Sequence, residues 1–290
     1  MTTLHPVSRL AIQEPMGNRL GEILIGLGKL SLDDVDKVVR TQTERDALFG
    51  EVARELRLVD DQDISMALAR QFRYPYLLRG EGALSPLLMA AYDPFSEQAE
   101  VLRTVRNQLT QTWFSEKRKG LVVLGCGAGA GNSVFTANLA LSFAQANERT
   151  LLIDANMRAP SQHELFRSGP HQGLSDMIAG RRMADMIFPV PGFDSLYLLP
   201  AGTVPPNPQE LLLHPGFRGL NERLAKQFDV ILLDVPSLAT AHDALIVAAQ
   251  TGGALMVLRR HATRVTEVKD ATRQLRRAGI SLAGCVMVDF

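Results

Sequence analysis

The sequence predicts an α/β fold: a mostly parallel sheet with helices on both faces, preceded by a small helical domain. An apolar run at 121–124 leads into a glycine-rich turn at 125–133 and then into a helical pattern over 134–148. Further apolar runs alternate with helical patterns, which is typical of right-handed βαβ units. Two of these runs end in an aspartate, Asp154 and Asp234. Sheets of this kind bind their ligands at the carboxyl ends of the strands.

The composition is that of an ordinary globular protein. The 290 residues are 46% hydrophobic and include 31 basic and 31 acidic side chains. A chain without net charge has no broad attraction to nucleic acid, so we expect no nucleic-acid partner. No apolar run approaches the roughly 18–20 residues needed to cross a bilayer, and the two distant cysteines fit a reducing compartment. We therefore expect a cytoplasmic protein.

Residues 1–78 are predicted to form the small helical domain, because they contain an internal repeat. The segment 20–24 recurs 29 positions later as 49–53, with glycine at the second place of each copy. A side-chain oxygen that can cap a helix follows in each copy, from Ser31 and from Asp60. Two related helical hairpins are therefore expected.

The stretch 79–94 is expected to be a linker, because glycines and prolines punctuate it. The main domain is then 95–290. It opens with a helical pattern in which Glu100, Arg103 and Arg106 recur at every third position, so these three side chains lie along one helix face.

The glycine-rich turn has the form that holds phosphate. Without side chains, its backbone N–H groups can converge on an anion, and the following helix adds partial positive charge. Gly129, Gly131, Asn132 and Ser133 are the predicted nucleotide contacts. Phosphate-binding loops usually carry a lysine directly before the last hydroxyl residue, and Asn132 holds that place here. An uncharged, short amide cannot neutralise a phosphate.

Three oxygen-bearing side chains are expected to meet at this loop. Ser133 would bind Mg²⁺ directly, Asp234 would hold the water shell of the metal, and Asp154 would orient or deprotonate the attacking group. Two aspartates that each end an apolar strand downstream of a glycine-rich loop favour a site for ATP and Mg²⁺.

An ordered set of motifs in residues 95–290 resembles the bacterial tyrosine kinase family. The resemblance implies the partitioning-ATPase branch of the P-loop NTPase fold, and phosphorylation of protein tyrosine with ATP and Mg²⁺. It also implies an inner-membrane polysaccharide co-polymerase as partner, with which such kinases set exopolysaccharide chain length. The matching segments are 129–133, 138–140, 151–160, 173–175, 199–212, 228–236 and 243–244.

The same resemblance implies further site residues. Arg158 joins the two aspartates as a catalytic residue, and Asn207 and Pro208 join the nucleotide contacts. The Glu100, Arg103 and Arg106 set matches the motif through which the family's kinase domains form a homo-oligomeric ring. Recruitment to the inner membrane would then occur only through the partner.

The N-terminal repeat resembles the N-terminal domain of type II secretion and type IV pilus ATPases. Together the two parts resemble the exopolysaccharide chain-length-determinant tyrosine kinases of the exosortase-linked type. Some of these secretion-ATPase domains bind cyclic di-GMP through a motif that Arg19, Leu20, Gly21 and Gln42 match. The alternative is that the repeat glycines only permit tight helix packing, and that the domain docks a protein.

Departures from the family pattern leave three functions open. Besides an active kinase, the chain can be a catalytically impaired pseudokinase that acts as a scaffold, or a partitioning or positioning ATPase. The family's usual cluster of tyrosines at the C-terminus is missing, and the only tyrosines are Tyr74, Tyr76, Tyr92 and Tyr197. The residues that depart from the pattern around the nucleotide are Asn132, Asn156, Ser237 and Val288.

Overall fold

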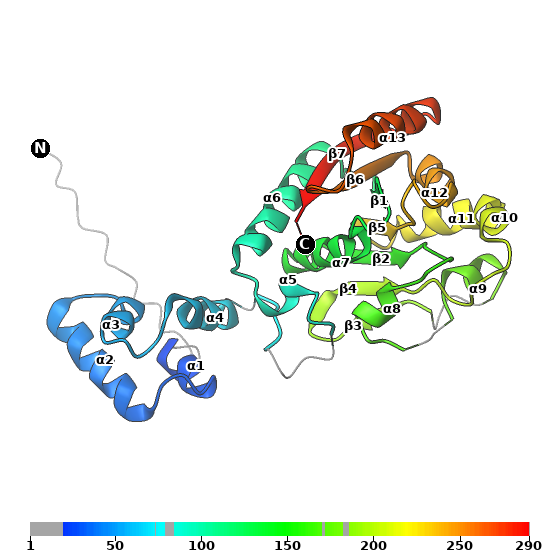
Figure 1. Ribbon diagram of the computed structural model, residues 1–290. Helices are drawn as coiled ribbons and strands as arrows, with labels where there is room; N and C mark the ends of the chain where they lie inside the picture. The colour runs from blue at the N-terminus through cyan, green and yellow to red at the C-terminus, as the bar shows by residue number, and fades with distance from the viewer. Residues whose placement is uncertain (1–19, 73, 79–83, 170–171, 182–185, 290) are drawn as a thin grey trace, which may run out of the picture. The chain divides into compact units, whose positions relative to one another are not determined.

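The computed structural model describes residues 20–72, 74–78, 84–169, 172–181 and 186–289. The chain divides into two compact units, Met1–Tyr74 and Pro75–Phe290 (Figure 1).

The N-terminal unit contains two helical hairpins. Helices α1 (Leu20–Gly26) and α2 (Leu32–Arg45) form the first hairpin, and α3 (Phe49–Glu55) and α4 (Asp61–Gln71) form the second. Both helix starts anticipated from the repeat are present as reciprocal capping boxes, at the N-termini of α2 and α4. Helix α1 lies against α4 and α2 lies against α3, so the hairpins close a shared apolar core.

The repeat glycines lie where the two hairpins meet. A Cβ atom on Gly21 would lie 3.1 Å from Cζ of Phe49, the residue before the second repeat glycine. A Cβ atom on Gly50 would lie 3.3 Å from Cδ1 of Ile64 and 3.7 Å from Cδ2 of Leu20, the residue before the first repeat glycine. The two copies therefore face each other reciprocally, and close packing accounts for both glycines. We call this contact the glycine joint.

The C-terminal unit is built on one seven-stranded sheet, in the order β3-β4-β2-β5-β1-β6-β7. All neighbours pair in parallel except β3 and β4, which are antiparallel. This confirms the predicted fold class. Strand β3 was not predicted, because three residues with a proline among them are too short to show a period. The strands are β1 (Gly120–Gly125), β2 (Thr150–Asp154), β3 (Phe188–Val190), β4 (Phe193–Leu199), β5 (Val230–Asp234), β6 (Gly253–Arg259) and β7 (Ser281–Val288).

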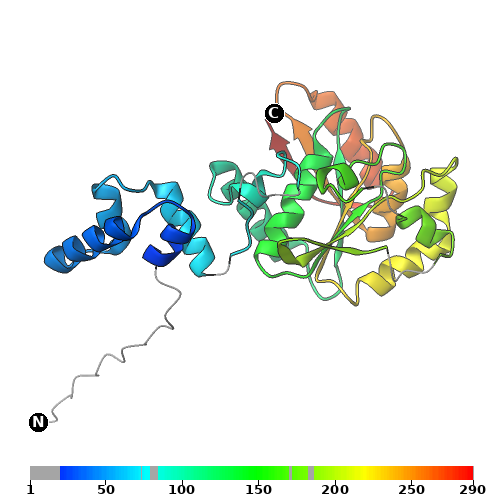
Figure 2. The ribbon, with the colours of Figure 1, turned by 90° about the horizontal axis from the view of Figure 1, so that it is seen from below.

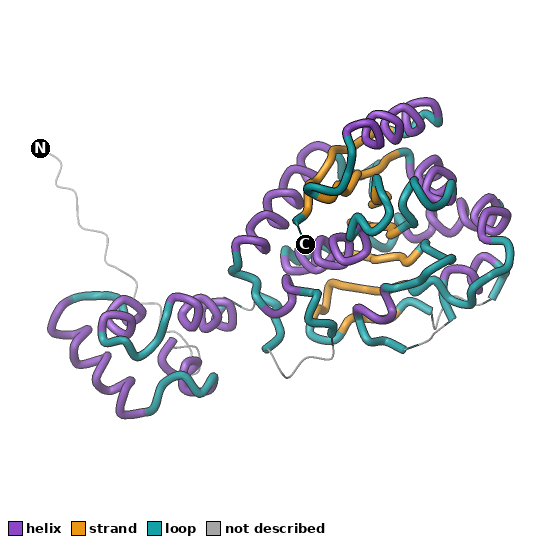
Figure 3. The backbone as a smooth tube through the Cα atoms, viewed as in Figure 1, coloured by secondary structure: helices purple, strands orange, loops and turns teal. Residues whose placement is uncertain are grey.

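Helices cover both faces of this sheet (Figures 2 and 3). Leu121 and Val123 of β1 belong to one apolar cluster, whereas Val122 and Leu124 belong to the other, as the alternation of side chains along a strand requires. The first cluster is closed by α5 (Met89–Tyr92), α6 (Glu97–Thr112), α7 (Asn132–Gln145) and α8 (Gln162–Leu165). The second is closed by α9 (Leu174–Ile178), α10 (Pro208–Leu213), α11 (Pro215–Leu224), α12 (Asp243–Thr251) and α13 (Val265–Arg277).

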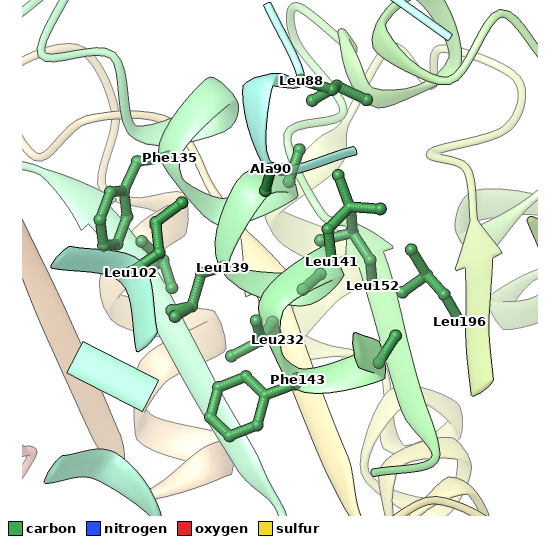
Figure 4. Packing of buried hydrophobic residues seen from close by; sticks show 14 of the residues in the cluster. Leu88, Ala90, Leu102, Phe135, Leu139, Leu141, Phe143, Leu152, Leu196 and Leu232 are labelled. Atoms are coloured by element: carbon green, nitrogen blue, oxygen red, sulfur yellow. The ribbon is translucent and has the colours of Figure 1, made fainter. Parts of the chain in front are cut away.

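Helix α7, which follows the glycine-rich loop, is buried on nearly every side. Figure 4 shows Leu139 and Phe143 of α7 packed among Leu102 of α6 and Leu232 of β5. Because α5 and α6 lie over its outer side, α7 carries apolar residues all round, as a fully enclosed helix does. The loop is thus anchored at both ends by buried elements.

The expected linker at 79–94 is wrong for residues 84–94. Leu84, Leu88 and Ala90 are fully or almost fully buried in the same cluster as α7. The side chain of Asn138 on α7 accepts a hydrogen bond from the N–H of Ala90 and donates one to the carbonyl of Leu87. Pro86 and Pro94 therefore lie at bends of a segment that packs against α7. Residues 79–83 of the expected linker lie outside the described residues.

In the described part of the chain, no helix has both the length and the apolar character needed to cross a membrane.

We expect Gly253→Ala to destabilise the C-terminal unit by about 2–3 kcal/mol, because overpacking a filled site forces shifts of this order. A Cβ atom at 253 would lie 1.8 Å from the indole ring of Trp113, and the ring nitrogen donates to the carbonyl of Gly120. Urea unfolding followed by circular dichroism and by Trp113 fluorescence measures the loss. Gly120→Ala is the matched control, since its Cβ would meet Thr251 at an ordinary 3.4 Å. Equal midpoints for the two variants would contradict the prediction.

Candidate functional site

The loop between β1 and α7 has the backbone of a phosphate cradle. Gly129 and Gly131 have φ of 67° and 76°, values that suit glycine. No side chain caps α7, so the N–H groups of its first turn are available to an anion. A Cβ atom on Gly125 would lie 2.9 Å from both Cβ of Ala130 and Oδ1 of Asn132, so the loop closes tightly only because residue 125 is glycine. This backbone fits bound phosphate.

Asn132 points inward beneath the loop. The residue is 9% exposed. Its Nδ2 donates to Oδ1 of Asp234 and to the carbonyl of Val235, at 2.9 Å in each case. The amide that replaces the expected lysine is therefore bonded to the end of β5, and in this arrangement it has no N–H left for a phosphate.

Asp154 and Asp234 lie side by side, as their positions at strand ends predicted. The two residues are register partners in the parallel pair β2–β5, and both are fully buried. Asp154 accepts three backbone hydrogen bonds, from the N–H groups of Asn156 (3.1 Å), Ser161 (2.9 Å) and Gln162 (3.0 Å). In this structure Asp154 therefore shapes the segment that follows β2.

Gln162 completes the site, and no sequence motif marked it. Its Nε2 donates to Oδ2 of Asp234 at 2.8 Å and to the carbonyl of Ser133 at 3.1 Å. Its Oε1 is buried and has no hydrogen-bond partner among the described residues. Two amides, from Asn132 and Gln162, thus hold the two oxygens of Asp234.

The buried aspartates resist carrying two negative charges. Burial, as the larger cause, and the negative charge of Asp154 together raise the pKa of Asp234 to about 7, against the lowering effect of Gln162, Ser133 and Asn132. Burial likewise raises the pKa of Asp154 to about 6, against the effect of its backbone bonds. The pair therefore favours a bound proton or a nearby cation.

The residues present fit a magnesium ion. The described residues contain no group of three or more His, Cys, Asp and Glu side chains placed to bind a metal. Magnesium does not need one, since it usually takes one or two protein oxygens and completes its shell with water and substrate phosphates. Gln162 bonds both to the carbonyl of Ser133 and to Asp234, and the Ser133 side chain lowers the pKa of Asp234, so the expected pair of metal-binding residues is brought together.

Arg158 is engaged away from the loop. Its Nε and Nη2 donate to the two oxygens of Asp243, at 2.7 and 3.2 Å. Asp243 is 1% exposed, and its Oδ1 also accepts from Nε2 of Gln209. This pairing lowers the pKa of Asp243 although burial opposes the effect. Arg158 therefore ties the segment after β2 to the start of α12.

Asn207 and Pro208 form the start of α10. Asn207 is exposed and precedes the helix, and Pro208 is buried at its first position. The next residue, Gln209, bonds to Asp243, so these two predicted nucleotide contacts adjoin the Arg158 network.

Two charged residues that no motif marked lie beside the loop. Nη1 of Arg259, at the end of β6, donates to the carbonyl of Gly129 at 3.4 Å. Oε2 of Glu267, on α13, would lie 3.7 Å from a Cβ atom on Gly127. Burial, and to a smaller extent the negative charge of Glu267, raise the pKa of Cys126 in the loop to about 11, so Cys126 is a filler and carries no reactive thiolate.

The residues of the expected oligomerisation motif bond within the chain. Glu100 pairs with Arg103, which also donates to the carbonyl of Pro94. Nη1 of Arg106 donates to the carbonyl of Ser142 on α7 at 2.9 Å. The two arginines thus brace α6, while the side chain of Glu100 stays 66% exposed.

The expected cyclic di-GMP motif gains no support from the structure. Arg19 lies outside the described residues. Leu20 and Gly21 belong to the glycine joint, and Gln42 is half-buried on α2. The described contacts support the alternative, in which these glycines serve helix packing.

Three relatives carry tyrosine-protein kinase names. EpsB of Ralstonia nicotianae is 35% identical over 203 residues, which are 69% of this chain and 26% of EpsB. The wzc protein of Salmonella typhi is 32% identical over 203 residues, which are 69% of this chain and 28% of that protein. CapB of Staphylococcus aureus is 30% identical over 212 residues, which are 73% of this chain and 92% of CapB. The chain thus spans about a quarter of EpsB and wzc, and most of CapB. None of the models that describe known protein families matches the sequence.

Solved structures of the same kind share the fold. The kinase domain of Escherichia coli tyrosine kinase ETK superposes with a TM-score of 0.67 and 28% identity, covering 70% of this chain and 79% of that one. The septum site-determining protein MinD of Pyrococcus horikoshii, a structure with Mg-ADP, has a TM-score of 0.50 and 18% identity over 59% of this chain and 70% of its own. The second likeness concerns the fold alone.

We expect Asp234→Asn to stabilise the folded protein at pH 8 by about 1–3 kcal/mol, because a raised pKa is a free-energy difference between folded and unfolded states. The folded pKa, about 7, lies above the ordinary 3.8. The stability that this proton contributes is therefore complete below about pH 4 and lost as the pH rises through 7. Urea midpoints at pH 5, 7 and 8 should fall less steeply for the variant than for the unaltered chain.

Asp194→Asn, at an exposed position on β4, is the control for the pH experiment and should leave the profile unchanged. A profile for Asp234→Asn as steep as that of the unaltered chain would show that the buried pair does not set the pH dependence.

Proposed function

The chain belongs to the bacterial tyrosine-protein kinase family, and from that premise we propose that it is an ATP-dependent protein-tyrosine kinase of exopolysaccharide synthesis. One observation carries the proposal: an open glycine cradle, the Ser133 hydroxyl and the Asp234 carboxylate meet at the carboxyl ends of β1 and β5. This combination of groups suits a nucleotide and its magnesium ion.

Each part of the site has a role in this proposal. The backbone around Gly129 and Gly131 binds the phosphates, and Ser133 and Asp234 hold Mg²⁺. Bound Mg²⁺–ATP supplies the phosphoryl group. Asp154 orients the tyrosine hydroxyl or accepts its proton, which requires the backbone bonds that now surround it to open. Its raised pKa, about 6, leaves it able to accept a proton near neutral pH.

A second function, a pseudokinase scaffold, is favoured by the position of Asn132. Its amide bonds to the aspartate that would serve the metal, and the loop itself carries no cation. Loss of one charge–phosphate contact in a shielded site costs on the order of 2–4 kcal/mol of transition-state stabilisation, about two to three decades in rate. In this reading the chain keeps its family's assembly role with little or no turnover.

Both functions use the same partners. We propose an inner-membrane polysaccharide co-polymerase that recruits the chain, a homo-oligomeric ring to which Glu100, Arg103 and Arg106 contribute, and protein docking through the N-terminal repeat unit. The support is the motif resemblance together with the kinase relatives. A partitioning or positioning ATPase has only the fold likeness to MinD in its favour, so we do not propose it.

We expect Asn132→Lys to strengthen binding of Mg²⁺–ADP about tenfold or more, because a charge-assisted contact to phosphate replaces a neutral amide. Titration calorimetry on the full chain measures the affinity, and Asp234→Asn should remove the dependence on Mg²⁺. Equal affinities for Asn132→Lys and the unaltered chain would show that residue 132 does not face the phosphates.

Phosphate transfer from ATP to a tyrosine-containing copolymer tests the activity itself. Turnover by the unaltered chain supports the kinase. Turnover by Asn132→Lys alone supports a scaffold whose site has lost its cation. Tight nucleotide binding by both without any transfer would contradict the kinase proposal.

A further inference from the structure

The loop lacks a cation of its own. Residues 126–133 contain no lysine or arginine, and both N–H bonds of the Asn132 amide are directed at the end of β5 and the residue after it. Arg158, the basic residue that the family motif assigns to the site, is paired with the buried carboxylate of Asp243. Its Nε lies 2.7 Å from Oδ2 of that residue. Moving Arg158 to a phosphate would leave that carboxylate without its charged partner, which is strongly unfavourable.

Strand β6 brings a different arginine to the same loop. In the parallel pair β1–β6, Gly125 is the register partner of Val257, and the N–H of Cys126 still donates to the carbonyl of Val257. Strand β6 then continues for two more residues beside the loop and ends at Arg259. The hydroxyl of Thr263 accepts from the N–H of Arg259 at 2.8 Å, which fixes the backbone there.

The side chain of Arg259 reaches the loop from this fixed point. Its Nη1 lies 3.4 Å from the carbonyl oxygen of Gly129, and the residue is exposed. A 3.4 Å contact to a neutral carbonyl is a long hydrogen bond, whereas a guanidinium forms shorter and stronger bonds to phosphate. With five N–H donors, a guanidinium can contact phosphate oxygens and the loop together.

We propose that Arg259 supplies the phosphate-neutralising positive charge that the loop lysine provides elsewhere, so that the cation comes from the neighbouring strand instead of from the loop. The proposal rests on the proposed nucleotide site. In this assignment Arg259 contacts only the phosphates of the nucleotide. It makes no contact with the base or the sugar, so a nucleoside without phosphate would not need it.

Calorimetric titration of the full chain with Mg²⁺–ADP and with adenosine tests this assignment. Arg259→Gln should weaken ADP binding about 10–100-fold, the range for a lost hydrogen bond to a charged group, and leave adenosine binding within about twofold. Arg259→Lys should recover part of the loss, because it keeps the charge. Arg260→Gln is the matched control: its side chain pairs with Asp289 at 3.3 Å, and it should bind ADP as the unaltered chain does.

A second set of variants separates this inference from the proposed function. In an Asn132→Lys background, Arg259→Gln should cost less than about threefold, because the restored lysine provides the charge. Full-strength ADP binding by Arg259→Gln overturns the assignment. The assignment is also overturned if the chain binds ADP only after Asn132→Lys is introduced. That result would still support the proposed nucleotide site. If neither chain binds ADP, the nucleotide site itself is wrong and the assignment falls with it.

Discussion

Asp154 and Asp234 lie beside each other at the ends of β2 and β5, and both are fully buried. Two carboxylates in such a place are unstable as a doubly charged pair unless donors or cations surround them. Backbone N–H groups satisfy one of them, and side-chain amides satisfy the other. The identity of the residues around this pair, including Gln162 and Asn132, follows from that electrostatic requirement.

The same requirement makes the asparagine at position 132 understandable. A neutral amide satisfies Asp234 without adding a charge to the interior, and it fills the space beneath the loop that Gly125 leaves open. The stability of the buried Asp154–Asp234 pair and the strength of the proposed nucleotide binding therefore require different properties of residue 132. The proposal for Arg259 separates these requirements, because an exposed side chain can carry charge without any desolvation in the unliganded protein.

Local patterns predicted the sheet, the loop, the strand-end aspartates and both capping boxes, because each of these depends on residues close together in the chain. The roles of Gln162 and Arg259 were not predictable in this way. Gln162 reaches Asp234 only because the segment after β2 turns back, and Arg259 reaches the loop only because β6 lies next to β1. The prediction of a linker at 84–94 was wrong for a similar reason. The few apolar residues of this stretch are buried because they pack against α7, which is distant in the sequence.

The glycine joint restricts how the N-terminal repeat can diverge. A larger residue at Gly21 needs a smaller one at Phe49, and a larger residue at Gly50 needs a smaller one at Leu20 or Ile64. A single substitution at either glycine meets a close neighbour in its own copy, Val35 for Gly21 and Ile64 for Gly50, and the one at Gly21 also meets Phe49 of the opposite copy. The contact between Gly21 and Phe49 thus links what is tolerated in one copy of the repeat to what is present in the other.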